Sequence, residues 1–314
     1  MKKLVLVDGN AIVHRAYHAL PPLSRKDGKL TNAVYGFFSM VLKIVSDIAP
    51  DGLIVCFDRA APTFRKQLYV AYQATRPKME DDLSYQFEVI HDVLSKANIK
   101  IFELDGYEAD DLIGTLARQA VEDGSPMFDQ VIILTGDRDM LQLVNHNVFI
   151  LAPVVGVTKM ILFDEEKVKE KYGLLPHHLV DYKALVGDAS DNYPGVAGIG
   201  PKTASTLINK FGSLEGIYRN LGEINPKVSE KLAKDAEQSA LAKKLATIDT
   251  NAPIHLESEE CSLTKLDRKA LLSEFEKLSF NSLINRFKLD KSATQKNNSS
   301  NSKNETTEDQ LNLL

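Results

Sequence analysis

Two kinds of hydrophobic pattern alternate over residues 1 to about 160. Short, consecutive apolar runs are typical of buried strands, and they lie at 3–7, 53–57, 99–102, 131–134 and 148–151. Longer stretches between them carry apolar residues at helical spacing, as at 34–48 and 87–94. Strands that alternate with helices predict βαβ units, and hence an α/β domain with a central, mainly parallel sheet flanked by helices.

The pattern changes from about residue 165 onward. Strand-like runs fade, and prolines and glycines punctuate short helical patterns, with longer ones at 228–248 and 266–275. We therefore expect an α/β domain over 1–174 and a mainly helical domain over 175–290. Residues 291–314 are polar, rich in Asn and Ser and without periodicity, which predicts a disordered tail or an interdomain linker.

The composition is that of an ordinary globular protein, with 44% hydrophobic and 26% charged residues among 314. No apolar run approaches the roughly 20 residues that a membrane span requires. The two cysteines form no disulfide framework or metal-binding spacing, so we expect a cytoplasmic protein with reduced thiols. The formal net charge of -5 argues against indiscriminate binding to polyanions, although acidic residues committed to metal ions would conceal a basic surface elsewhere.

Acidic residues follow several of the predicted strands or open the helices after them. The set comprises Asp8, Asp58, Glu108, Asp110, Asp111, Asp137, Asp139, Asp188 and Asp191. Because the carboxyl ends of parallel strands share one edge of the sheet, we expect these side chains in one cleft. Two unit charges about 4 Å apart repel by roughly 4 kcal/mol at an effective dielectric of about 20, so such a cluster requires cations.

Each of these acidic residues alone also suits a helix cap or a turn. Their coincidence in five distant segments favours a metal site, because hard divalent ions take oxygen ligands. The chemistry that suits this set is two-metal catalysis with Mg²⁺ or Mn²⁺. Ions about 3.5–4 Å apart activate a water and stabilise the leaving oxygen of a phosphoester.

A tight glycine turn leads into an apolar helix directly after the last acidic pair. Gly195, Gly198 and Gly200 precede Lys202 and Thr203 at the helix start. The N–H groups of such a turn and of the helix N-terminus bind anions. A glycine turn alone is usually only a helix connection, but Lys202 and the adjacent acidic pair favour a grip on a phosphate backbone.

Residues 59–79 form a basic and aromatic stretch that lacks acidic residues. Its members are Arg59, Arg65, Lys66, Arg76 and Lys78, interleaved with Phe64, Tyr69 and Tyr72. Mixed cations and rings suit a single nucleic-acid strand, because charges bind phosphates and rings stack on bases. A solvated basic helix face is the alternative. Arg15 and Tyr17, just beyond Asp8, would extend the same surface.

With these residues in hand, the chain resembles the bacterial 5′-nuclease family, which includes the 5′→3′ exonuclease domain of DNA polymerase I and belongs to the flap-endonuclease superfamily. The resemblance covers roughly residues 1–290. It rests on six motifs: Leu6-Val7-Asp8-Gly9, Val55-Cys56-Phe57-Asp58, Gly106-Tyr107-Glu108-Ala109-Asp110-Asp111, Thr135-Gly136-Asp137-Arg138-Asp139, Gly187-Asp188-Ala189-Ser190-Asp191-Asn192, and Gly195 through Lys202. It implies a PIN-like nuclease domain followed by a helix-3-turn-helix domain.

The resemblance also implies a role for each carboxylate. The first metal ion would lie near Asp8, Asp58, Glu108 and Asp110, with Asp111 between the two ions, and the second near Asp137, Asp139, Asp188 and Asp191. Residues 59–85 would be a helical clamp over the active site. The glycine turn would hold duplex DNA, with a monovalent cation such as K⁺.

The clamp departs from the family pattern at one position. The family commonly carries a lysine directly after a tyrosine, aimed at the scissile phosphate, whereas here Gln73 follows Tyr72. Arg76 matches the family, and Lys78 or Lys66 would substitute for the missing cation. A neutral amide hydrogen-bonds a phosphate without offsetting its charge, so we expect slower catalysis.

The resemblance implies a 5′→3′ exonuclease and 5′-flap endonuclease that acts on DNA in replication and repair, such as primer removal. Its partners would be DNA with free 5′ ends or 5′ flaps and a fused or separate DNA polymerase, and we expect a monomer. Three alternatives stay open: a non-catalytic DNA-structure-binding protein, a PIN-type RNase, and a phosphohydrolase of the haloacid dehalogenase type. The last is disfavoured because Asn10, not an aspartate, follows Asp8 at the required spacing.

Overall fold

The centre of the molecule is one six-stranded sheet. The structure is a computed structural model, and it describes residues 1–25, 27–122, 124 and 126–288. The strands are β1 (Lys3–Asp8), β2 (Gly52–Cys56), β3 (Lys100–Phe102), β4 (Gln130–Leu134), β5 (Val148–Val155) and β6 (Lys159–Phe163), in the order β3-β2-β1-β4-β5-β6. The tail predicted at 291–314 lies outside the described residues.

All neighbouring strands pair in parallel except β5 and β6, which are antiparallel. The predicted α/β fold with a mainly parallel sheet is therefore confirmed. The sequence did not predict β6, because its side chains alternate between exposed and half-buried and present no buried run. β1 lies between β2 and β4 in register, so the carboxyl ends of these three strands meet at one edge.

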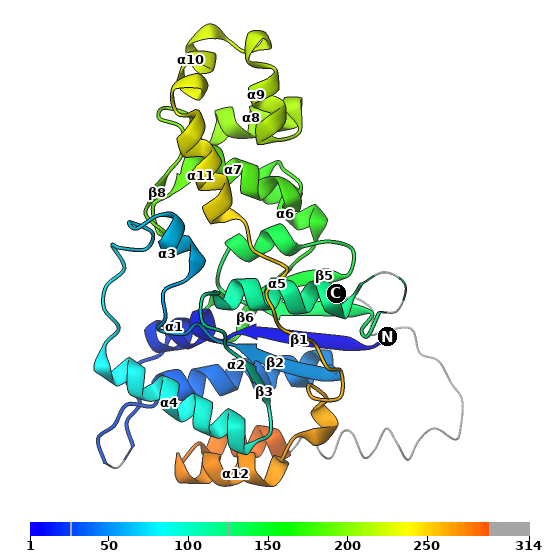
Figure 1. Cartoon of the computed structure of the whole chain (residues 1–314). Coiled ribbons are helices and arrows are strands. Elements are labelled where there is room, and N and C mark those ends of the chain that lie inside the picture. Colours follow the sequence, from blue (N-terminus) through cyan, green and yellow to red (C-terminus); the bar gives the residue numbers. More distant parts are fainter. Residues whose placement is uncertain (26, 123, 125, 289–314) are drawn as a thin grey trace.

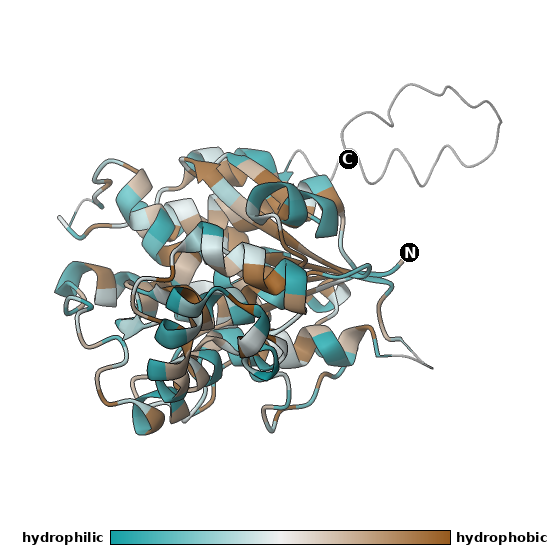
Figure 2. Ribbon diagram, turned by 90° about the horizontal axis from the view of Figure 1, so that it is seen from above, coloured by the Kyte–Doolittle hydropathy of each residue, from teal (hydrophilic) through white to brown (hydrophobic). Residues whose placement is uncertain are grey.

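Helices cover both faces of this sheet (Figure 1). Val5 and Val7 point into one core with α1 (Gly9–Ala19), α2 (Asn32–Ile48) and α4 (Asp81–Lys96). Leu4 and Leu6 point into the other core with α5 (Ala109–Ala120) and the 3-10 helix η1 (Asp139–Leu143). Successive side chains of a strand alternate between faces, so the apolar run over residues 4–7 of β1 serves both cores. Figure 2 shows the hydrophobic strands at the centre, with helices around them.

A second, helical part stands on the sheet domain and occupies the upper half of Figure 1. Its helices are α6 (Glu165–Tyr172), η2 (Pro176–His178), α7 (Leu179–Val186), α8 (Pro201–Phe211), α9 (Leu214–Arg219), η3 (Leu221–Glu223), α10 (Pro226–Lys234) and α11 (Ala236–Ala246). A two-stranded ribbon of β7 (Gly187–Asp188) and β8 (Tyr193–Pro194) lies between α7 and α8. The helical pattern expected over 228–248 is two helices, which meet at Asp235.

The expected helical domain over 175–290 requires a correction. After α11 the chain runs back along the sheet domain to η4 (Leu263–Lys265), α12 (Arg268–Lys277) and a last helix over 281–288 (Figure 1). Leu271, Phe275 and Leu283 belong to the core that α2 and α4 form on the sheet. The helical domain therefore ends near residue 246, because these apolar side chains are buried on the first domain.

The segment between β2 and α4 reaches up beside the helical part (Figure 1). The resemblance implied a helical clamp over 59–85, but only α3 (Phe64–Leu68) and the start of α4 are helical there, and turns, bends and irregular backbone make up the rest. Among the described residues, no helix is long and apolar enough to cross a membrane.

Candidate active site

The ends of β1, β2 and β4 place three acidic residues at the edge of the sheet. Asp8 is 3% exposed and caps α1, because its Oδ1 accepts from the Ala11 N–H at 2.9 Å. Its other oxygen accepts from the Thr135 hydroxyl at 2.7 Å. Asp137 follows β4 and accepts the N–H of Asp139 at 2.8 Å. Asp8 can therefore cap α1 and also belong to the candidate site.

The N-terminus of α5 brings further carboxylates to the same edge. Asp58 Oδ1 accepts from the first helical N–H, that of Ala109, at 2.7 Å, which ties the end of β2 to α5. Glu108 precedes the helix and accepts from the Thr63 hydroxyl at 3.0 Å. Among the described residues, no hydrogen bond or ion pair reaches the carboxylate of Asp110. A half-buried carboxylate without a partner is costly, so Asp110 is poised for a ligand that the protein itself does not supply.

Asp111 and Arg65 form a buried ion pair. Two guanidinium nitrogens of Arg65 bind both oxygens of Asp111 at 2.8 Å, and Nη1 also lies 3.3 Å from Glu108. Nε and Nη2 donate to the carbonyls of Leu245 and Thr247. All five guanidinium donors are thus matched, and the two residues are 2% and 0% exposed.

This pair changes two expectations from the sequence. Arg65 was expected to contact DNA, but its donors are consumed inside the protein. Asp111 was expected between two metal ions, but both of its oxygens face Arg65, and one also accepts the N–H of Glu108 at 3.1 Å. The physical reason is burial. A charge removed from water is strongly destabilised unless an opposite charge pairs with it. We therefore remove both residues from the candidate site.

The second group of carboxylates comes from η1 and from the ribbon after α7. Oxygens of Asp139, Asp188 and Asp191 lie within 4.8 Å of one another, a spacing at which one ion can bind all three. Asp188 is fixed by its own turn, since its Oδ1 accepts from the Ser190 N–H at 2.7 Å. Lys183 of α7 donates to both Asp139 and Asp188. Sequence reasoning missed Lys183, whose only signal is its position five residues before Asp188.

The two groups line neighbouring cavities. The larger cavity, of 700 Å³, is lined by seven of the nine predicted carboxylates: Asp8, Asp58, Glu108, Asp110, Asp137, Asp139 and Asp191. The second, of 470 Å³, is lined by Asp188 and Lys183 and shares Asp137, Asp139 and Arg76 with the first. His14, to which the sequence assigned no role, also lines the larger cavity.

The electrostatics of this cluster fit a cation site. The pKa values of Asp8 and Asp139 are both raised to about 7. Burial is the largest cause, and the charges of neighbouring carboxylates add to it. Burial also raises the pKa of Asp110, and Asp137, Asp8 and Asp58 add to the effect. Carboxylates that resist ionisation together become stable anions when a divalent ion binds them, and oxygen ligands are what Mg²⁺ and Mn²⁺ take. The donor set therefore fits hard divalent ions.

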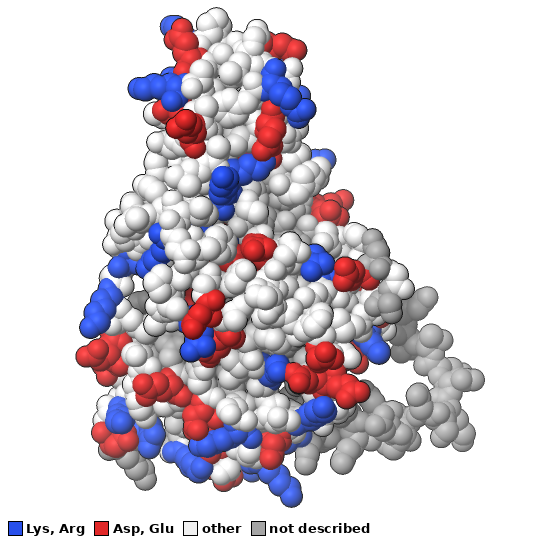
Figure 3. Space-filling model, viewed as in Figure 1, with Lys and Arg blue, Asp and Glu red and all other residues white. Residues whose placement is uncertain are grey.

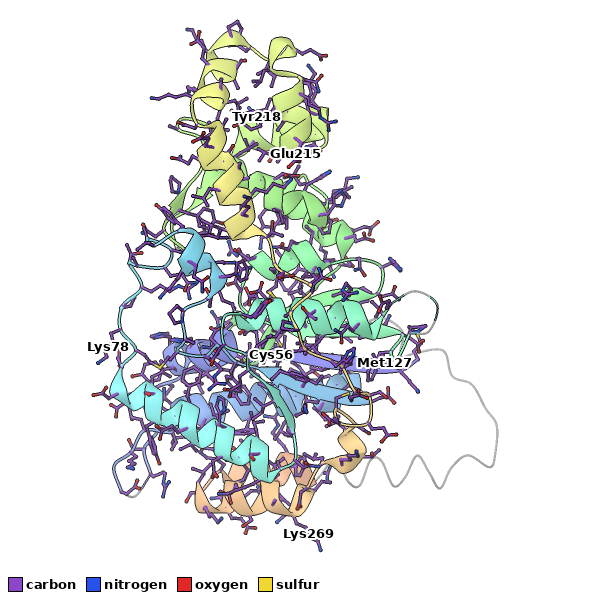
Figure 4. All side chains as sticks on the ribbon, in the orientation of Figure 1. Cys56, Lys78, Met127, Glu215, Tyr218 and Lys269 are labelled. Atoms are coloured by element: carbon purple, nitrogen blue, oxygen red, sulfur yellow. The ribbon has the colours of Figure 1, made fainter. Side chains whose placement is uncertain are left out.

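The clamp segment turns its polar side chains onto the second group. Arg76 donates to Asp191 at 2.7 Å and Gln73 donates to the same oxygen at 3.2 Å, while the Tyr72 hydroxyl donates to Asp191 at 3.2 Å. Tyr72 is buried, so its ring is packed in the protein rather than open to a base. Lys66 and Lys78 line the larger cavity and are exposed, and Figure 4 shows Lys78 at the outer edge of the segment.

The outer residues expected to contact DNA lie on α1 and at the glycine turn. Arg15 donates to the carbonyl of Gly156 at 3.2 Å, and the Tyr17 hydroxyl donates to Glu80 at 2.5 Å. Gly200 is the N-cap of α8, which places Lys202 and Thr203 in its first turn. Both lysine and threonine are therefore positioned at the amino end of a helix.

Two glycines of the turn have packing roles. A Cβ on Gly195 would lie 2.4 Å from the backbone nitrogen of Gly187, so glycine permits β8 to approach the end of α7. Gly198 has a φ of +75°, and its carbonyl accepts from the Lys231 ammonium at 3.0 Å. A protein cation therefore already contacts one carbonyl of the turn at which the resemblance implied K⁺.

Comparison with known families accounts for most of the chain. The family described as "5'-3' exonuclease, N-terminal resolvase-like domain" matches residues 3–173, and "5'-3' exonuclease, C-terminal SAM fold" matches residues 174–269. The chain belongs to the 5′-3′ exonuclease family. The boundary between the two matches falls just after α6, so Asp139 belongs to the first match and Asp188 to the second.

Curated relatives of this 5′-3′ exonuclease family member are of two lengths. DNA polymerase I of Bacillus subtilis is 40% identical over 299 residues, which is 95% of this chain but 34% of that protein. A 5'-3' exonuclease of Aquifex aeolicus is 38% identical over 284 residues, which is 90% of this chain and 94% of that protein. The chain thus spans about a third of the polymerases and nearly all of the separate exonuclease.

Solved structures share the fold at lower identity. A structure of the phage T5 5'-exonuclease with divalent zinc ions has a TM-score of 0.66 at 22% identity, and covers 88% of this chain and 99% of that chain. The T5 D15 flap endonuclease, in a pseudo-enzyme-product complex with DNA and metal ions, has a TM-score of 0.64 at 20% identity, with 91% and 100% coverage.

Proposed function

We propose that this chain is a divalent-metal-dependent 5′-nuclease that acts on DNA, as a 5′→3′ exonuclease and a 5′-flap endonuclease. The observation that carries the proposal is the cavity of 700 Å³ lined by seven carboxylates, six of which are buried or half-buried, with the pKa of Asp8 raised to about 7. Lys183 and Arg76 offset only part of the charge of this cluster, which is too costly to be only structural. Membership of the family and the names of its relatives support the same reaction.

The chain's own residues divide the work of the reaction. Two bound divalent ions, which we take to be Mg²⁺, would supply a nucleophilic water and stabilise the departing 3′ oxygen. Asp8 and Asp110, with Asp58 and Glu108 beside them, would hold the first ion. Asp137, expected from the resemblance at the second ion, is the carboxylate that acts most strongly on Asp110, so we place it with the first. Asp139, Asp188 and Asp191 would hold the second, at the seam of the two domains.

The clamp segment would hold the 5′ end of the substrate. Lys66 and Lys78 line the cavity without an ion pair among the described residues, so both are available to phosphates. Arg76 contacts Asp191 and is half-exposed, and it would reach the scissile phosphate once that aspartate binds an ion. Gln73 and Tyr72, which touch the same aspartate, would orient it rather than contact the nucleic acid.

Duplex DNA would lie along the glycine turn and the start of α8. Lys202, Thr203 and the N–H groups at this helix start offer donors to phosphates of one strand. Arg15 and Tyr17 of α1 would extend the contact on the other side of the cavity. We keep a K⁺ ion at the turn, a monomeric state, a cytoplasmic location, and a fused or separate DNA polymerase as parts of the same proposal.

Product sizing on a labelled 5′-flap duplex tests the function. We expect cleavage in Mg²⁺ or Mn²⁺ and none in EDTA, with products that come from the flap junction and the 5′ end. A flap of identical sequence made of RNA serves as the matched substrate. Faster cleavage of the RNA flap would favour the PIN-type RNase, and binding without cleavage in either metal would favour a DNA-structure-binding protein.

A further inference from the structure

Lys183 is placed inside the second carboxylate group. It rises from α7, and its ammonium donates to Asp139 on one side and to Asp188 on the other. The side chain is 20% exposed, so solvent screens this contact only in part. Asp139, Asp188 and Asp191 are the three residues whose oxygens lie within 4.8 Å of one another. The ammonium therefore lies among ligands that suit one divalent ion.

The two halves of the acidic cluster differ in how they are neutralised. In the second half, Lys183 pairs with Asp139 and Asp188, and Arg76 pairs with Asp191. In the first half, no described lysine or arginine forms an ion pair with Asp8, Asp110 or Asp137. Burial alone would lower the pKa of Lys183, but Asp139 and Asp188 raise it, so this side chain stays charged.

We propose that Lys183 is an internal counter-ion that holds the second metal position while no ion is bound there, and that a divalent ion must displace it to bind. This inference rests on the proposed metal-dependent function of the site. The ammonium keeps Asp139 and Asp188 together across the seam of the two domains, at the expense of affinity for the ion. In the first half Arg65 lies near Glu108 but is already bound to Asp111, and no described lysine or arginine pairs with Asp8, Asp110 or Asp137. This half therefore fills at lower metal concentration.

Metal binding without DNA is the direct test. Lys183→Met keeps the length of the side chain and removes its charge. Mn²⁺ titrations of the full chain, with free Mn²⁺ counted by electron paramagnetic resonance, should show the weakest class of sites about tenfold tighter in Lys183→Met, or one additional ion bound. Lys169→Met on α6, an exposed lysine without an ion pair among the described residues, is the matched control and should match the wild type.

Thermal unfolding gives a second readout that does not depend on cleavage. In EDTA, Lys183→Met should melt at a lower temperature than the wild type, because Asp139 and Asp188 lose their counter-ion. Saturating Mg²⁺ should restore its melting temperature, and Lys183→Arg, which retains the charge, should melt like the wild type in EDTA. This restoration also establishes that the Met variant folds.

The proposal is overturned if Lys183→Met has the Mn²⁺ isotherm of the wild type, or binds Mn²⁺ more weakly. The latter result would show that Lys183 helps ion binding instead of competing with it. Failure of the nuclease proposal is distinguishable, because it would leave these metal isotherms intact while flap DNA stayed uncut.

Discussion

At the scale of single residues, the buried carboxylates make stability depend on pH. Burial raises the pKa of both Asp8 and Asp139 from 3.8 to about 7, so the folded chain holds protons that the unfolded chain has released. The free energy of unfolding in EDTA should therefore fall as pH rises from 5 to 7, by on the order of 2 kcal/mol. Urea denaturation at several pH values measures this trend.

Asp8→Asn is the control for this pH dependence. An amide does not ionise, so the variant should lose part of the decline between pH 5 and 7. Saturating Mg²⁺ should also flatten the decline for the wild type, because the ion stabilises the charged carboxylates. Stability that rises with pH in EDTA over this interval would contradict the account.

Gln73 is the residue at which the chain departs from its family's pattern. Its backbone has a φ of +54°, and its side chain donates to Asp191, beside Arg76. Gln73→Lys adds a cation near the reacting phosphate, so single-turnover cleavage of a flap should become about tenfold faster. An unchanged rate would show that Lys66 or Lys78 already supplies that charge, and combining the change with Lys66→Met or Lys78→Met would identify which.

At the scale of the elements, Arg65 connects α3, the start of α5 and the segment after α11. Removing one partner of a buried ion pair leaves the other charge uncompensated, so Arg65→Met should lower the free energy of unfolding by about 3–5 kcal/mol. Arg59→Met is the matched control, since its pair with Asp105 is half-exposed and contributes little. Equal denaturation midpoints for the two variants would refute a structural role for Arg65.

Elements also show what sequence patterns can predict. Buried strands and the long helix α2 were predictable, because their apolar residues repeat at strand or helix spacing. β6 was not, since two of its five side chains are exposed and only one is buried, and neither was the return of α12 to the sheet, which depends on distant packing. Among site residues, carboxylates at strand ends were predictable. The partners of Arg65 and Lys183 were not, because Arg65 meets Asp111 across 46 residues and Lys183 meets Asp139 across 44.

At the scale of the whole molecule, the acidic side chains are unevenly distributed, because many of them lie in one cavity. The formal net charge is -5, yet seven carboxylates line one cavity and are set aside for cations. On the face shown in Figure 3, basic and acidic side chains are intermingled over both domains, so a single basic field does not dominate that face. Binding to DNA should then depend on a limited number of placed cations.

The salt dependence of the affinity for DNA measures how many of these basic side chains contact phosphates. We expect contacts with about five phosphates. A plot of the logarithm of the association constant for flap DNA against the logarithm of KCl concentration should then have a slope of about -4. Titrations in EDTA prevent cleavage during the measurement. Lys202→Met should make the slope shallower by about one, and a flat response for the wild type would contradict binding through phosphates.

The most direct test of the central claim is the single-turnover rate of Asp110→Asn on a labelled 5′-flap duplex in Mg²⁺. The carboxylate of Asp110 has no hydrogen bond or ion pair among the described residues. Replacing it with an amide therefore breaks no contact within that part of the protein. The account predicts cleavage slower by on the order of a hundredfold or more, with a melting temperature in EDTA no lower than that of the wild type. Asp105→Asn, an exposed control at the same end of α5, should cleave like the wild type. A wild-type rate for Asp110→Asn would contradict a metal-dependent nuclease centre at this sheet edge.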